Sequence, residues 1–468
     1  MNDRMNELGN DSIGRLLLRY SMPAMIAMCV NSLYNLVDTI FVGYGAGTLA
    51  LAALAVSWPI QMIVVAVGMA IGIGTASVVS RSLGAGDPDR ARRVAGTAFV
   101  TIAVISLCIT VLGWMYLRPL LSTFGATEGI MPYAVDYLSI TFIGNVFLST
   151  SICANNIIRS EGAARVAMSS MIVGAVVNGV LDPVFIFGFD MGIKGAAVAT
   201  VIANVCTFSF VSWYFLSGRS LLKIRRRDLI PDFKDLPEVF KIGSASFFSM
   251  AVGSFMAIPI NGLIVHYGAD IHLAIVGVAN RSMMFFFMPI FGLTQGLQPI
   301  IGFNYGAGNL QRVKETVLKA SSYATAMSTV AFVVLMFFTG TVLRIFSPDQ
   351  ELIAEGIPVM RIFVICVPFV GFQMVGGAFF QALGRARPAF VITLSRQVIV
   401  LLPLIFIVPR FYGLTGLWAS FPMADFVSTS ITAWWVFTAV RGLGEDTVPT
   451  DIEISNEVEV DLVASTQD

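Results

Sequence analysis

The chain contains two copies of one unit, and each copy is made mostly of long apolar segments. Residues 83–86 read Leu-Gly-Ala-Gly in a polar stretch after a long apolar run, and residues 305–308, Tyr-Gly-Ala-Gly, occupy the matching place 222 residues later. The run 159–165 is echoed by 381–387 at the same spacing. A long repeat of apolar helices is typical of transport proteins built from two bundles around a central cavity.

Composition places this repeat in a membrane. Of the 468 residues, 56% are hydrophobic and only 12% are charged, with a mean hydropathy of +0.80. Soluble domains carry about 25% charged residues. The five cysteines all lie in apolar segments, so we expect no disulfide frame, no metal cluster and no bound cofactor.

Twelve segments are apolar enough to cross a bilayer, which requires about 20 residues of helix. Six lie in each copy, so the copies are parallel and related by a pseudo-twofold axis along the membrane normal. The predicted fold is therefore an all-α membrane protein with two six-helix bundles. The predicted spans are 16–43, 49–80, 94–117, 130–157, 165–188, 193–216, 238–265, 273–303, 316–339, 354–380, 388–408 and 415–438.

Basic residues are distributed unequally between the two sets of loops. The N-terminus, the loops after the second and eighth spans and the segment between the copies are rich in Arg and Lys, whereas the opposite loops hold only Arg118, Lys194, Arg344 and Arg410. Because cytoplasmic loops carry the excess of positive charge, we expect both termini to be cytoplasmic in an inner (plasma) membrane.

These spans predict four parts of the chain. The last part is acidic and we assign it no function. The parts are an N-terminal six-helix bundle with a cation site (1–216), a cytoplasmic linker (217–237), a C-terminal six-helix bundle (238–440) and an acidic cytoplasmic tail (441–468).

Polar residues gather on two spans of the first copy. Asp38 lies on the first span with Asn31 and Asn35, at a spacing that puts all three on one helical face. On the fifth span, Asn178 and Asp182 are four residues apart and share a face. Ionisable groups inside the hydrocarbon are costly, which makes each a functional candidate.

The depths of these side chains in the membrane predict that they lie close together. Asp38 lies roughly 7–8 Å and Asp182 roughly 9 Å below the outer ends of their spans, at 1.5 Å per residue. Tyr137 on the fourth span and Thr200 on the sixth enter at comparable depth. The alternative is a purely structural role, in which the side chains of the asparagines, Thr200 and Tyr137 only form hydrogen bonds between helices.

The chemistry of such a cluster suits a small cation. Two carboxylates in a medium of low dielectric take up H⁺ or Na⁺ to relieve their repulsion, and oxygen donors favour a hard cation. Asp38, Asn178 and Asp182 are the candidate Na⁺ ligands, and Asn31 and Asn35 are assigned to the substrate cavity.

Two prolines are candidate hinges beside these groups. Pro23 lies on the first span and Pro183 directly follows Asp182. A proline inside a helix frees a carbonyl and permits a kink, so a proton bound next to one is a candidate switch.

The second copy carries different charges. Its spans contain Arg281, Arg361, Arg396 and Asp425, and spans seven and ten have no deep acid. We expect an Arg–Asp pair to hold helices together, with a cavity-facing role for Asp425 as the alternative.

Several of these motifs together resemble one family. They are residues 35–43 (Asn-Leu-Val-Asp-Thr-Ile-Phe-Val-Gly), the Leu-Gly-Ala-Gly loop followed by 87–93, its Tyr-Gly-Ala-Gly twin, and 178–183. The combination resembles the multidrug and toxic compound extrusion (MATE) family, over nearly all of residues 12–440. The resemblance implies two six-helix bundles around a V-shaped cavity and efflux of amphipathic, often cationic, compounds in exchange for H⁺ or Na⁺.

The resemblance also implies a set of site residues. The prokaryotic branch with its cation site in the first bundle uses a span 1 Asp, a span 5 Asn/Asp pair, a span 4 Tyr and a span 6 Thr. Matched motif by motif, these are Asp38, Asn178, Asp182, Tyr137 and Thr200. The acids that another branch has on spans seven and ten are missing here, which argues against a cation site in the second bundle.

Alternatives to a multidrug antiporter remain at this stage. A flippase for a lipid-linked precursor, from the same wider superfamily, needs a cationic cavity, which Arg281, Arg361 and Arg396 would supply if they face it. An intramembrane enzyme or signalling receptor lacks support, because no metal, nucleophile or phosphate-loop motif is present. A channel is a further alternative, but the unequal distribution of acids between the two copies favours coupled transport. We expect a monomer in the lipid bilayer that takes small drug-like molecules and no nucleic acid.

Overall fold

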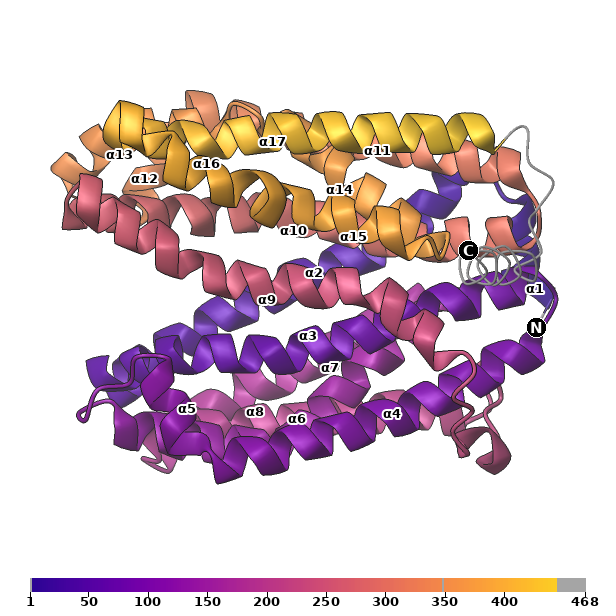
Figure 1. Ribbon diagram of the computed structural model, residues 1–468. Helices are drawn as coiled ribbons and strands as arrows, with labels where there is room; N and C mark the ends of the chain where they lie inside the picture. The colour runs from indigo at the N-terminus through magenta and orange to yellow at the C-terminus, as the bar shows by residue number, and fades with distance from the viewer. Residues whose placement is uncertain (1, 347–348, 444–468) are drawn as a thin grey trace, which may run out of the picture.

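The computed structural model describes residues 2–346 and 349–443, and over these residues the chain forms helices and turns without β-strands (Figure 1). Each of the twelve predicted spans is helical over nearly all of its length. The predicted fold class, an all-α membrane protein of two bundles, is confirmed. The acidic tail lies, apart from residues 441–443, outside the described residues.

The N-terminal half begins with a short helix and then supplies six spans. Its fifth span continues beyond Pro183 as a π-helix, η1, so the helix changes its hydrogen-bonding pattern there. The helices are α1 (Asn2–Asn10), α2 (Ile13–Ala46), α3 (Thr48–Gly84), α4 (Pro88–Met115), α5 (Leu117–Thr123), α6 (Met131–Ser160), α7 (Ala164–Pro183), η1 (Val184–Gly188) and α8 (Gly192–Leu216).

The C-terminal half repeats this order after a connecting segment that contains only the 3₁₀ turn η2 (Arg226–Leu229). Two of its spans are each built from more than one helix. The helices are α9 (Leu236–Tyr267), α10 (Asp270–Gly306), α11 (Leu310–Phe337), α12 (Thr339–Phe346), α13 (Gln350–Val364), α14 (Val367–Ala382), α15 (Ala386–Leu394), η3 (Ser395–Leu401), α16 (Leu402–Ile407) and α17 (Pro409–Gly442).

Length and hydropathy alone identify fewer spans than twelve. Among residues 2–346 and 349–443, ten helices are long and apolar enough to cross a membrane, and α13 with α14, bent by 45°, makes an eleventh. The twelfth predicted span is α17, whose inner positions include Asp425, Ser428 and Thr432. These polar residues lower its hydropathy, yet all three are buried inside the protein.

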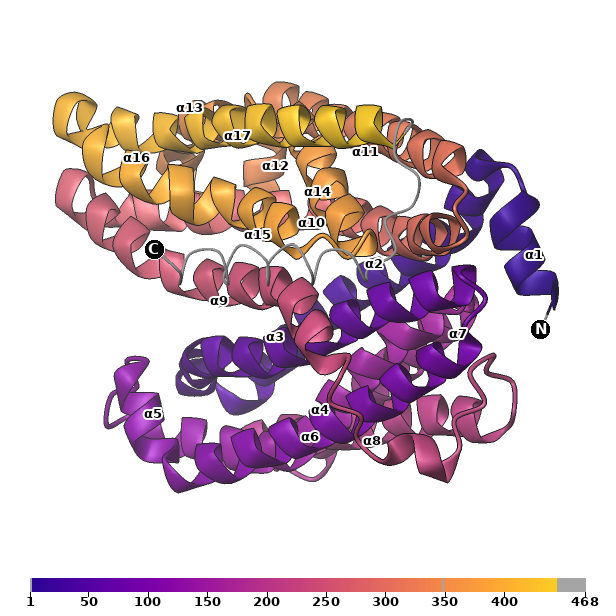
Figure 2. The same ribbon diagram turned by 45° about the vertical axis from the view of Figure 1, so that its right-hand side comes forward.

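The two halves pack against each other at one end and separate toward the other (Figures 1 and 2). We call the end that carries α1 and residues 217–235 the linker end, and the opposite end the far end. The contacts between halves are mainly those of α3 with α9 and of α2 with α10, which are equivalent pairs in the repeat. A third contact joins α3 to α10.

Two glycines bring α3 and α10 together at the linker end. A Cβ atom added to Gly84 would lie 1.9 Å from the carbonyl oxygen of Phe303, and one added to Gly306 would lie 2.0 Å from that of Arg81. Each contact is the other one shifted by the repeat of 222 residues. The pseudo-twofold axis therefore passes between these helix ends, and only glycine permits so close an approach.

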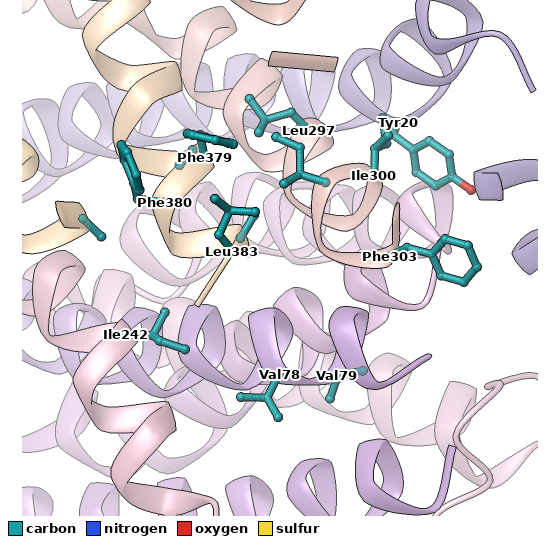
Figure 3. Packing of buried hydrophobic residues seen from close by; sticks show 14 of the residues in the cluster. Tyr20, Val78, Val79, Ile242, Leu297, Ile300, Phe303, Phe379, Phe380 and Leu383 are labelled. Atoms are coloured by element: carbon teal, nitrogen blue, oxygen red, sulfur yellow. The ribbon is translucent and has the colours of Figure 1, made fainter. Parts of the chain in front are cut away.

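A continuous apolar core crosses the boundary between the halves near the linker end (Figure 3). Val78 of α3 and Ile242 of α9 belong to the same cluster as Leu297 of α10 and Phe379 of α14. In addition, Ser77 Oγ donates a hydrogen bond of 2.6 Å to the carbonyl oxygen of Gln381. The linker end is thus closed by packing as well as by polar contacts.

Ion pairs reinforce this closed end. Arg81 Nη2 lies 2.5 Å from Glu238 Oε1, and Arg90 bridges Glu238 and Asp235, both at 2.9 Å. The pairs join the last turn of α3 and the first turn of α4 to the start of α9, so they connect the halves. They are partly exposed, and each contributes less than a buried pair would.

The short helix α1 also bridges the halves. Its Arg4 donates to Tyr214 Oη of α8 at 3.0 Å, whereas Arg312 of α11 donates to the carbonyl oxygens of Leu8 and Asp11 at 3.1 and 2.7 Å. The N-terminal segment therefore binds both bundles at the linker end.

Candidate functional site

Asp38 and Asp182 lie together between α2 and α7. Their carboxyl groups are within hydrogen-bonding distance of each other. Asp182 has no exposed surface, and Asp38 is half-buried. A hydrogen bond between two carboxyl groups needs a proton on one of them, because ionised carboxylates only accept.

Asn178 connects this pair to α8. Its Nδ2 atom donates to Asp182 Oδ1 at 3.3 Å and to Thr200 Oγ1 at 3.4 Å. The Thr200 hydroxyl in turn donates to the carbonyl oxygen of Ala196, one turn earlier on α8. The spacing of Asn178 and Asp182 thus puts both on the side of α7 that faces α2 and α8.

Tyr137 lies beside the carboxyl pair, together with two residues that sequence reasoning missed. The Tyr137 side chain on α6 interacts electrostatically with Asp38 and hydrogen-bonds to Gln61 of α3. Tyr34, one helical turn before Asp38, interacts with both carboxyl groups. Its spacing from Asp38 was a signal in the sequence, whereas nothing in the apolar segment around Gln61 indicated a neighbour on α6.

Three oxygens of this cluster accept no hydrogen bond from an N–H or hydroxyl group among the described residues. They are Asp38 Oδ1, Asp182 Oδ2 and Asn178 Oδ1. Buried polar atoms are rarely left unpaired, so unpaired acceptors at one place indicate room for a proton or a hard cation. Across the described part of the chain, no group of three His, Cys, Asp or Glu residues forms a metal centre.

The two asparagines assigned to the cavity lie on α2 closer to its middle. Asn35 Nδ2 donates to the carbonyl oxygen of Asn31 at 2.7 Å and lies 3.3 Å from Asn31 Oδ1. Both side chains are half-buried. They bond within their own helix, so of these three α2 residues only Asp38 has a side-chain partner on α7.

The two candidate hinges differ in position. Pro183 adjoins Asp182 at the change from α-helix to π-helix, a feature often found at functional sites. Pro23 lies inside the unbroken helix α2, roughly 22 Å from Asp38 at 1.5 Å per residue. It is flanked by Ser21 and Met25, which contact Gly296 and Gly292 of α10. Pro23 therefore lies at the contact between the two halves and far from the carboxyl pair.

Both bundles of this chain match one known protein family. The family model described as MatE matches residues 23–184 and 245–407, one match for each bundle. The chain belongs to the MatE family. It is accordingly a membrane-embedded transporter and not an enzyme, and the family resemblance found in the motifs is confirmed.

Relatives of this MatE protein match it over most of its length. Multidrug export protein MepA of Staphylococcus aureus (strain MRSA252) is 25% identical over 412 residues, which cover 88% of this chain and 90% of MepA. The ligand-bound structure of the MATE multidrug transporter DinF-BH is 41% identical, with a TM-score of 0.86 over 92% of this chain and 96% of that one. A crystal structure of MATE in complex with MaD3S is 26% identical, with a TM-score of 0.89 over 95% and 99%.

The charges of the second bundle are arranged differently from those of the first. Arg396 Nε pairs with Asp425 Oδ1, which joins η3 to α17, so the expected Arg–Asp pair is present. Arg361 is exposed on the side of α13 away from its buried residues. Arg281 is exposed on α10. Arg396 is thus held in an ion pair, whereas the flippase alternative requires all three arginines to face the cavity.

Proposed function

We propose that this MatE protein exports amphipathic, often cationic, small molecules in exchange for H⁺ or Na⁺ by alternating access. The named function of MepA and the ligand-bound multidrug transporter support export of this class of compound. We further propose that it works as a monomer in the inner membrane, with both termini and residues 217–237 in the cytoplasm. The linker end is then the cytoplasmic end.

One observation carries the coupling proposal, namely the contact between the Asp38 and Asp182 carboxyl groups. The pair holds one proton when the two groups hydrogen-bond and repels when both are ionised. Proton uptake therefore favours the packing of α2 on α7, and proton release favours the separation of these two helices. Asn178, Thr200 and Tyr137 add oxygen atoms and donors that also suit Na⁺.

The helix α2 is the element through which this change would act. It carries Asp38 in its far-end half and packs on Gly292 and Gly296 of α10 in its linker-end half. The π-helix after Pro183 gives α7 an irregular segment beside Asp182. A shift of α2 at the carboxyl pair therefore alters the contact between halves, and coupling follows if ion and cargo favour different arrangements.

Alternating access requires the linker end to open and the far end to close. The contacts that must break are the packing of Gly84 and Gly306, the ion pairs of Arg81 and Arg90, and the bridging contacts of α1. With the linker end in the cytoplasm, the arrangement described above is the outward-facing one.

The test is efflux of a cationic dye from proteoliposomes under a pH gradient and, separately, under a Na⁺ gradient. Asp38→Asn should abolish ion-driven efflux while the purified protein stays folded. Asp136→Asn is the matched control, because Asp136 adjoins Tyr137 but pairs at the surface with Lys194 at 3.3 Å. Normal gradient-driven efflux by Asp38→Asn would refute the coupling role. The gradient that drives the wild-type protein identifies the ion.

A further inference from the structure

Arg281 is an exposed cation on α10 of the second bundle. It lies 11 residues from the start of α10, or about 16 Å along the helix from the far end. Its side chain is exposed, and no hydrogen bond or ion pair joins it to another described residue. A free guanidinium at such depth in the hydrocarbon is costly, so Arg281 is expected to face water or an anion.

The contacts of α10 show which way Arg281 faces. Gly292 and Gly296 are the positions where α10 touches Met25 and Ser21 of α2. Residues 281, 285, 288, 292 and 296 follow one another at steps of three or four, so they form one stripe along the helix. Arg281 therefore lies on the side of α10 that faces α2, nearer the far end than the contacts at Gly292 and Gly296. The two halves separate toward that end (Figure 2).

The same register gives its level relative to the first bundle. The contacts pair Gly296 with Ser21 and Gly292 with Met25, so the two helices run antiparallel. Continued along both helices, this register brings Arg281 level with position 36, which lies between Asn35 and Asp38 on α2. Arg281 thus lies close to the level of Asp38, whose own carboxyl group lies against Asp182 of α7 within the first bundle.

The surroundings of Arg281 indicate the chemistry of a ligand. Phe285 and Met284, one turn further along α10, are 57% and 49% exposed. A guanidinium binds carboxylate or phosphate groups with two parallel hydrogen bonds, and Met and aromatic side chains adapt to varied apolar groups. An amphipathic molecule with an anionic group matches this combination.

We propose that Arg281 binds the anionic group of transported amphiphiles, so that the cargo includes zwitterionic and anionic compounds as well as cations. This inference rests on the export function proposed above. It makes Arg281 a specificity-determining residue whose removal changes which compounds bind, without changing the coupling pair.

The experiment compares two dyes that differ only at one carboxyl group, rhodamine 6G (an ethyl ester) and rhodamine 19 (its free acid). Binding is measured by fluorescence anisotropy to the full chain in phosphatidylcholine nanodiscs. Arg281→Gln should raise the Kd of the free acid about tenfold, the effect of losing one charged hydrogen bond, and leave that of the ester within about twofold. Arg281→Lys should retain most of the preference.

Arg361→Gln is the matched control, because Arg361 is exposed at a similar depth of α13 but faces away from the helices of its own bundle. An unchanged ratio of the two Kd values in Arg281→Gln, or an equal change in Arg361→Gln, would overturn the proposal. So would failure of the free acid to bind the wild-type protein that binds the ester. Loss of the preference when phosphatidylglycerol replaces half of the lipid would assign Arg281 to lipid instead.

A separate measurement distinguishes failure of the export function. Efflux of rhodamine 6G from proteoliposomes under imposed gradients tests transport and coupling, whereas the ratio of the two Kd values tests Arg281 alone. Absence of efflux, together with a Kd ratio that Arg281→Gln alters as expected, would refute export and leave the anion site in place as a binding site.

Discussion

Replacement of Gly306 by alanine should open the linker end of the protein. The added Cβ atom would lie 2.0 Å from the carbonyl oxygen of Arg81 and 2.8 Å from its carbonyl carbon. Because the obstructing atoms belong to the backbone of α3, no side-chain rotation relieves the contact. The ends of α3 and α10 must separate by more than about 1 Å to reach an ordinary van der Waals distance.

The size of the effect follows from the cost of overpacking. Inserting a methyl group into a close contact costs about 1–3 kcal/mol. The contact exists only while the linker end is closed, so this cost falls on the closed arrangement and not on the open one. At a factor of ten per 1.4 kcal/mol, the ratio of open to closed molecules should rise about 5- to 150-fold.

Distances between spin labels at positions 93 and 314 measure this change. Arg93 and Lys314 are exposed residues near the linker ends of α4 and α11, one in each half. In a background without the five native cysteines, Gly306→Ala should add a population at longer distance. Gly277→Ala is the control on the same helix, because a Cβ atom there meets nothing within 4 Å. An unchanged distance distribution in Gly306→Ala, or the same shift in Gly277→Ala, would refute the reasoning.

Two further predictions concern buried charges. Glu161, fully buried after α6, accepts hydrogen bonds from Tyr214 Oη, Ser220 Oγ and the Leu221 amide, and burial raises the pKa of its carboxyl group. The stability that the protonated Glu161 contributes is present at low pH and is lost as pH rises through its raised pKa. The melting temperature should therefore fall across that pH range, and Glu161→Gln should make its dependence on pH weaker. Equal pH dependence in the two proteins would contradict this. Asp425→Leu should destabilise the protein by about 3–5 kcal/mol because Arg396 is left unpaired, and Arg396→Met in addition should restore most of the loss. Thermal unfolding of the single and double variants tests this, and a double variant no more stable than the single one would contradict it.

The fold was largely predictable from the sequence because the two copies constrain each other. The spacing of 222 residues between Gly84 and Gly306 predicted equivalent helix ends, and the structure brings these two ends together. Apolar length predicted where each span lies, since backbone groups in lipid must be satisfied within a helix. The span that hydropathy detects least well, α17, is the one whose polar residues are buried against its neighbours.

The candidate site was predictable only in part. Helical periodicity placed Asn178 and Asp182 on one face, and the structure places that face against α2 and α8. Periodicity also grouped Asn31 and Asn35 with Asp38, yet the two amides bond to their own helix and only the carboxyl group reaches α7. The functional roles of these residues stay predictions until the coupling experiment is done.

The sequence by itself determined the number of spans, the repeat and the polar faces of individual helices, because these follow from local composition and from the helical period. Only the tertiary structure decided that Tyr34 and Gln61 adjoin the carboxyl pair, that Arg396 binds Asp425, and that Arg281 faces the first bundle. The physical reason is that lipid and helix interiors are about equally apolar. Hydropathy therefore does not predict how one helix is rotated relative to another. Packing between helices sets that rotation.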